Sequence, residues 1–118
     1  MEIASSIVPR SYDFALRIIK MCNAMRRQGT ERTLVSQVLR AGTSIGANVE
    51  EAQGAHSRRD FAAKMRIAYR EARETHYWLR LLRDSGMVSA AKLNSIVDEC
   101  EQIGRILSAI LVTTKART

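Results

Sequence analysis

The stretch from Ser57 to Gly86 constrains the fold more than any other part of the chain. Ser57, followed by Asp60 three residues later, resembles a capping box, and Gly86 is typical of a helix end. Between them, one set of side chains recurs at alternating steps of four and three residues: Phe61, Met65, Ala68, Ala72, Thr75, Leu79 and Leu82. This spacing places the set on one side of an α-helix. The stretch therefore predicts one long amphipathic helix.

Three further segments carry apolar stripes with the same period. Their members are Ala15, Ile18, Ile19, Cys22 and Met25, then Leu34, Val38, Ala41, Ile45, Asn48 and Ala52, and finally Leu93, Ile96, Cys100, Ile103, Leu107 and Ile110. Gly29, Gly54 and Gly86 separate the four segments, and the alternation of a strand is missing. Short connections make successive helices antiparallel. The chain is therefore predicted to be all-α, an up-down-up-down antiparallel four-helix bundle forming a single domain over residues 1–118.

Several positions predict where the helices begin and how closely they pack. The first helix is expected to start between Ser6 and Ser11, with Pro9 in or just before its first turn, where a missing N–H costs little. Thr30 or Thr33 is expected to cap the second helix, and Ser89 the fourth. Inside the second helix, Gly42 and Gly46 each cost about 1 kcal/mol relative to alanine. They predict either the close approach of a neighbouring helix or a locally weak helix.

Positive charge is concentrated in the third segment. The chain has 19 Lys and Arg against 12 Asp and Glu, a net charge of +7, which favours anionic partners such as nucleic acid. Residues 58–84 carry eight basic and four acidic side chains, a net of +4, whereas residues 34–56 carry one and two, a net of −1. Seven-residue steps align four arginines, which we call the basic row: Arg59, Arg66, Arg73 and Arg80.

The basic row has two interpretations. It spans about 31 Å at the helical rise, and with Arg70 nearby it suits contacts to RNA or DNA phosphates without base readout. The alternative is a solvated helix face with side-chain pairs such as Arg70–Glu74.

Two other groups of side chains carry hypotheses. Ile67, Trp78 and Leu81 form a second apolar row on the third helix, which predicts a homo-oligomer interface; alternatively, Trp78 covers the bundle edge. Glu51 and Glu74 lie near the apolar sides of their helices, and a partly buried carboxylate needs a partner. The hypothesis is a structural polar cluster that fixes helix register, made of Arg40, Asn48, Glu51 and Glu74, with Arg70 as a further partner.

The sequence shows little sign of catalytic chemistry. Di-iron bundles use a Glu three residues before a His. Here Gln53 precedes His56 and Arg73 precedes His76 at that spacing, so the pattern fails at both histidines. No glycine-rich phosphate loop follows a strand, and the serines and cysteines lack an evident His/Asp partner set. We expect no enzymatic activity, no catalytic residues, no metal, no cofactor and no small-molecule substrate.

Cysteine usage and hydropathy bear on location. Cys22 and Cys100 lie on apolar stripes and are too few for a disulfide framework or a zinc site. The N-terminus lacks the apolar run of a secretory signal, and no apolar stretch approaches the roughly 18 residues of a membrane span. A cytoplasmic location without membrane contact is expected.

The third segment also resembles a known family. Residues 71–82 are similar to the EAxETxYWLxLL signature of the intervening-sequence proteins, small bacterial four-helix bundles, some of which are encoded in insertions within large-subunit ribosomal RNA genes. Residues 37–51 are similar to the family pattern QxxRAxxSIxxNIxE, and residues 99–113 also agree. Gly46 and Ala52 depart from the family pattern, where many members have proline and glycine respectively.

The resemblance implies a cytosolic bundle that self-associates, as a ring of five subunits in some members, with no established catalytic residues. Related bundles in retroelements bind nucleic acid, which is an analogy only. The first hypothesis is therefore a non-enzymatic homo-oligomer that binds RNA or DNA backbones. The alternative is a protein-interaction or assembly subunit without a nucleic-acid role.

Overall fold

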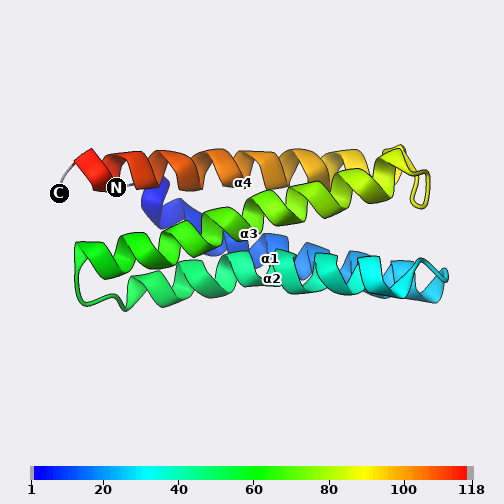
Figure 1. Ribbon diagram of the computed structural model, residues 1–118, viewed down its shortest axis with the longest axis horizontal. Helices are drawn as coiled ribbons and strands as arrows, with labels where there is room; N and C mark the ends of the chain where they lie inside the picture. The colour runs from blue at the N-terminus through cyan, green and yellow to red at the C-terminus, as the bar shows by residue number, and fades with distance from the viewer. Residues whose placement is uncertain (1, 117–118) are drawn as a thin grey trace.

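The computed structural model describes residues 2–116, which form four helices. They are α1 (Glu2–Arg27), α2 (Arg32–Gln53), α3 (Arg58–Asp84) and α4 (Ala90–Ala116). They form a rod of 47 × 20 × 20 Å, in which each helix runs antiparallel to the next (Figure 1). Within residues 2–116 there is no strand. The prediction of an all-α, up-down-up-down bundle is confirmed.

The helices pack in a square. Each helix contacts the next one along the chain, and α4 closes the square against α1. In the described part of the chain, no Cα atom of α1 comes within 8 Å of one in α3, so these two helices stand at opposite corners. In Figure 1, α3 and α4 lie close at their connected end and separate toward the other end.

Glycine terminates two of the helices at predicted positions. Gly29 has φ +78° and Gly86 has φ +79°, a conformation that glycine adopts without strain. After α1, the N–H of Gly29 donates to the carbonyl of Arg26, and that of Thr30 donates to the carbonyl of Met25. This Schellman arrangement satisfies carbonyls that the helix end leaves open. The predicted ends at Gly29 and Gly86 are confirmed.

Two predicted helix starts are wrong. Pro9 lies inside α1, which begins at Glu2 rather than between residues 6 and 11. Ile7 and Phe14, seven residues apart and both buried, extend the core face across the proline. The cap of α2 is Glu31, whose carboxylate accepts from the N–H groups of Thr33 and Leu34 at 3.2 Å. It occupies the position expected for Thr30 or Thr33 because its side chain reaches both free donors.

The core follows the predicted stripes closely in α3 and α4. Every predicted α4 position is buried, and so are the predicted α3 positions except Phe61, which is partly buried. In α1, Phe14 is buried, whereas the predicted inner residue Ile19 is 41% exposed. α2 buries a wider face than predicted, since it packs against both α1 and α3.

The two interior glycines of α2 lie against α1. A Cβ at Gly42 would stand 2.9 Å from two carbons of Ile18, and one at Gly46 would stand 3.2 Å from the carbonyl oxygen of Ser11. Real side chains are rarely this close, so only glycine fits without a shift. The predicted close approach of a neighbouring helix is confirmed.

Candidate nucleic-acid interface

Helix α3 presents two different flanks to its neighbours. The flank toward α4 carries Tyr69, Arg73, His76 and Arg80, which line a groove shared with α4. The flank toward α2 carries Glu71, Glu74 and Trp78, which form a polar cluster with α2. We call the first the groove flank and the second the closed flank.

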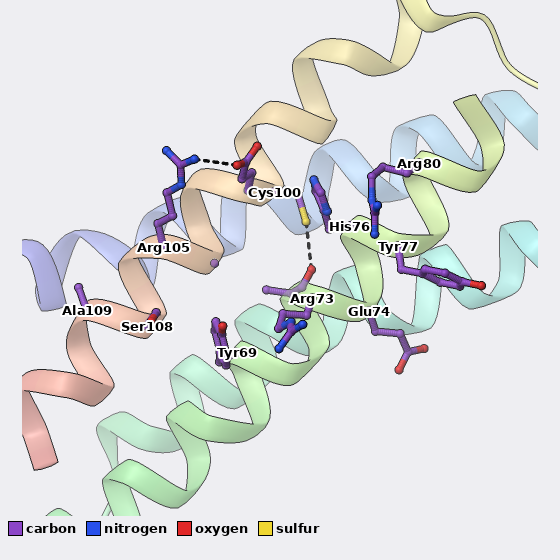
Figure 2. A pocket seen from close by; sticks show the side chains of 13 residues that line it. Tyr69, Arg73, Glu74, His76, Tyr77, Arg80, Cys100, Arg105, Ser108 and Ala109 are labelled. Atoms are coloured by element: carbon purple, nitrogen blue, oxygen red, sulfur yellow. Dashed lines mark hydrogen bonds and ion pairs between the residues drawn. The ribbon is translucent and has the colours of Figure 1, made fainter. Parts of the chain in front are cut away.

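The groove between α3 and α4 has a volume of about 860 Å³. Its base is made of small side chains from both helices: Ala72, Cys100, Gly104 and Ser108. Figure 2 shows Tyr69, Arg73, His76 and Arg80 on α3, with Arg105 and Ser108 opposite them on α4. The groove exists because α3 and α4 diverge and because small residues leave the space between them unfilled.

The two groove-flank arginines carry free positive charge. None of the ion pairs formed by residues 2–116 involves Arg73 or Arg80, and both side chains are exposed. The guanidinium carbon of Arg73 lies 6.0 Å from the centroid of the Tyr69 ring, within cation–π range. These cations are available to an anion in solution.

The acidic groups around the groove are already engaged. Glu101 pairs with Arg105 at 2.8 Å, one turn along α4. The Glu74 side chain points away from α4 in Figure 2, and its carboxylate is in direct contact with Arg40 on α2. Neither carboxylate therefore neutralises Arg73 or Arg80 through a direct pair.

His76 lies between these charges. Burial lowers the pKa of its imidazole, and the nearby guanidinium groups of Arg80 and Arg83 lower it further, while Glu101 acts in the opposite direction. His76 is therefore neutral at pH 7, and its protonation at lower pH adds a positive charge to the groove.

The rest of the basic row lies beyond the groove. Arg59 and Arg66 are exposed on α3 toward its N-terminus, and Arg70 is exposed as well. The alternative pair Arg70–Glu74 is not formed among the described ion pairs, because Glu74 contacts Arg40 instead. The whole row therefore presents its guanidinium groups to solvent.

The closed flank joins α3 to α2. Arg40 contacts Glu74 directly and approaches Glu71 at 3.3 Å. The indole N–H of Trp78 donates to the same Glu74 carboxylate at 2.9 Å. Here one guanidinium and one indole satisfy two carboxylates, so the flank carries no free positive charge.

The structure unites only two of the four residues in the predicted polar cluster. Arg40 and Glu74 are in contact, but Asn48 donates to the carbonyl of Ser44 in its own helix at 2.8 Å. Glu51 is exposed, so its expected partial burial is wrong. Ala52, the next residue, takes the core position, and this turns Glu51 toward solvent.

The predicted oligomer row is partly open to solvent. Ile67 is 37% exposed and Leu81 is 38% exposed, whereas Trp78 is partly buried against the core. The Trp78 ring also packs edge-on against Tyr77, with centroids 5.2 Å apart. Trp78 thus covers the bundle edge, and the two aliphatic side chains remain available for a partner.

The sequence pattern did not lead us to expect a second exposed apolar row, which lies on α1. Tyr12, Leu16 and Ile19 are 55%, 44% and 41% exposed, at helical spacing of four and three residues. Their spacing is visible in the sequence, but it runs beside the core stripe, and only the packing of α1 separates the two rows. Since α1 and α3 stand at opposite corners, their apolar rows lie on different sides of the rod.

Comparison with known proteins gives the family. The chain matches the model of the 23S rRNA-intervening sequence proteins over residues 4–109. The chain belongs to the 23S rRNA-intervening sequence protein family. The resemblance seen in the signature residues of α2 and α3 is therefore confirmed.

A solved structure agrees with this family membership. The chain is 37% identical to a protein with unknown function from the S23 ribosomal protein family of Bacteroides thetaiotaomicron, known from a crystal structure. The match has a TM-score of 0.88 and covers 92% of this chain and 97% of that one. No curated protein matches the chain.

The two thiols of this 23S rRNA-intervening sequence family member are buried. Cys100 donates to the carbonyl of Ala72 at 3.3 Å, linking α4 to α3 below the groove (Figure 2). Burial raises the pKa of Cys100 to about 12 and that of Cys22 to about 11. Both thiols stay protonated at neutral pH, and the thiolate is the nucleophilic form.

In the described part of the chain, residues 2–116, no three His, Cys, Asp or Glu side chains come together as metal ligands. None of the helices described there has both the length and the apolar character to cross a membrane.

Proposed function

We propose that this family member is a non-enzymatic, homo-oligomeric bundle that binds RNA or DNA backbones through the exposed arginines of α3. The observation that carries the proposal is the contrast in charge between the two flanks of α3. Arg73 and Arg80 line an open groove and take part in none of the ion pairs of residues 2–116, while Glu71 and Glu74 of the same helix are bound by Arg40.

Arginine is suited to this role. Its planar guanidinium donates several hydrogen bonds and matches phosphate geometry, and it is always charged. Side chains that contact phosphates fix position without reading sequence. The chemistry on α3 therefore supports sequence-independent binding.

The salt dependence of binding tests the proposal. Four phosphate contacts predict a log–log slope of roughly −3.6 for duplex DNA and roughly −2.8 for a single strand. Fluorescence anisotropy with a labelled oligonucleotide measures both affinity and slope. Arg27→Ala, at an exposed position of α1, is the matched control and keeps the wild-type slope. Binding that is absent at low salt, or that does not vary with salt, removes the proposal.

The absence of catalysis is part of the proposal. Its support is chemical: the buried thiols stay protonated, and within residues 2–116 no hydrogen bond joins His76 to a hydroxyl or a carboxylate that would make it a base for a nucleophile. The buried free cysteines also suit a reducing cytoplasm, where we propose the protein acts.

Homo-oligomerisation is supported by the two apolar rows. Because the rows on α1 and α3 lie on different sides of the rod, pairing one with the other on a second copy is a heterologous contact, which can close a ring. A ring of five is the arrangement we propose first, and it would multiply the basic rows and add avidity.

The runner-up function is an assembly subunit without a nucleic-acid role, which the exposed row Tyr12, Leu16 and Ile19 favours. Light scattering on Leu81→Ser tests the interface, because Leu81 is exposed enough to change without unfolding the bundle. A fall in mass, with an unchanged circular dichroism spectrum, is expected. An oligomer of unchanged mass counts against the α3 row as an interface.

A further inference from the structure

Gly104 has no packing reason to be glycine. It lies inside α4, where glycine destabilises a helix relative to alanine, and a Cβ added there would meet nothing within 4 Å. Gly42 is the opposite case, because Ile18 fills the space above it at 2.9 Å. Glycine is used where a backbone must let a ligand approach, and the open space above Gly104 is the groove.

The walls of the groove offer flat surfaces beside the cations. Tyr69 and Tyr77 line it, with Arg73 lying over the Tyr69 ring at 6.0 Å. Aromatic rings and guanidinium planes are the surfaces on which unpaired bases stack. A volume of about 860 Å³ falls within the range of roughly 300–1,000 Å³ that small-molecule sites occupy.

The shape of the basic row favours a single strand over a duplex. It extends about 31 Å along α3 and turns by only about 60° around the helix axis over that length. A duplex strand makes nearly one full turn over the same distance, since it repeats every 34–36 Å or so, and therefore moves away from the row, whereas a flexible single strand can follow it. A paired base must also be extruded before it can enter a groove.

We propose that the α3–α4 groove receives an unpaired base of a single-stranded nucleic acid, above Gly104 and against Tyr69, with adjacent phosphates on Arg73 and Arg80. The inference rests on the proposed function and names its substrate class. An acidic peptide is the competing occupant, but carboxylates make no use of the tyrosine faces.

The test compares a short labelled oligothymidylate with the same strand annealed to oligoadenylate. The single strand should bind at least about ten-fold more tightly, because extrusion of a base opposes duplex binding. Tyr69→Ala should weaken single-strand binding by about five- to 150-fold, the range for loss of one stacked base, and should weaken duplex binding much less. Tyr69→Phe, which keeps the ring, should restore single-strand affinity.

Gly104→Leu fills the groove without changing any charge. It should lower single-strand affinity while the melting temperature stays the same or rises, and Ala47→Leu, which adds the same side chain on the exposed surface of α2, should change neither. Should Gly104→Leu fold poorly, Gly104→Ala serves in its place, since a methyl group fits there.

The failures of the two proposals are distinguishable. If strand and duplex bind equally, and Tyr69→Ala and Gly104→Leu have no effect while Arg73→Ala weakens both, the groove inference is overturned and backbone binding stands. If no oligonucleotide binds, both proposals are overturned. Displacement of the strand by polyglutamate, with loss of polyglutamate binding in Tyr69→Ala, overturns the inference in favour of an acidic peptide.

Discussion

The two flanks of α3 are built from the same helix and differ in what their neighbours supply. On the closed flank, α2 brings Arg40 to the carboxylates of Glu71 and Glu74, and Trp78 completes the cluster. On the groove flank, α4 brings Gly104 and Ser108, which neither fill the space nor pair with Arg73 and Arg80. The closed flank holds α3 against α2, whereas the groove flank is exposed to solvent.

Charge alone does not mark a functional arginine. Arg40 and Arg73 have the same chemistry, but Arg40 has its carboxylate partners within the fold. A charged group with an internal partner serves packing and register, whereas one without a partner beside a hollow surface is available to a ligand.

Reversing the charge of the groove flank should have the largest effect. Arg73→Glu with Arg80→Glu should lower affinity for single-stranded nucleic acid by about 100-fold, because two charge-assisted hydrogen bonds are lost. Anisotropy at low salt measures this, with melting temperature as the control for folding. A double variant that binds as well as the wild-type protein would show that the groove flank does not bind nucleic acid.

The glycines of α2 and α4 should respond in opposite directions to alanine. Gly42→Ala should destabilise the fold by about 1–3 kcal/mol, since the new methyl overlaps Ile18. Gly104→Ala should stabilise it by up to about 1 kcal/mol, because helix propensity improves with no clash. Urea denaturation measures both, and a stable Gly42→Ala would contradict the close approach of α1.

Removing the guanidinium of the closed flank should affect stability and leave binding alone. Arg40→Ala should cost up to about 1 kcal/mol, the range for partly exposed ion pairs. Its affinity for nucleic acid should equal that of the wild-type protein. A loss of affinity like that of the groove variants would show that the two flanks are not separate.

The pH dependence of binding should give the smallest effect. The pKa of His76 is lowered below its ordinary value of 6.5, so affinity should rise about two- to five-fold as pH falls through it and the groove gains a charge. Stability should move the other way, because the unfolded chain takes up this proton first as pH falls below 6.5. His76→Gln should abolish the pH dependence of both affinity and stability. If the variant keeps either dependence, a group other than His76 causes it.

The helices and most of the core follow from the sequence. The period of Met65, Leu79 and their neighbours, and the glycines at 29 and 86, were sufficient because each is a local property of one helix. The start of α1 could not be predicted from local sequence. Ile7, on the N-terminal side of Pro9, is buried in the core, and this burial stabilises helix on both sides of the proline.

The sequence predicted the arginines of the candidate site but not the groove beside them. The seven-residue spacing identified Arg73 and Arg80, but periodicity does not fix the direction in which an up-down bundle turns. It therefore cannot say which flank of α3 meets α2 and which meets α4. The groove depends on that choice, because Gly104 signals an opening only when Tyr69 and Arg73 stand opposite it.

The two flanks can be followed together in one titration by nuclear magnetic resonance. The indole N–H of Trp78, the single tryptophan of the chain, reports on the closed flank, and the amide of Gly104 reports on the groove. On addition of oligothymidylate, the amide resonances of Gly104, Tyr69 and Arg73 should shift, whereas the Trp78 indole resonance should stay unmoved. A shift at Trp78 with the Gly104 amide unmoved would rule out binding in the groove.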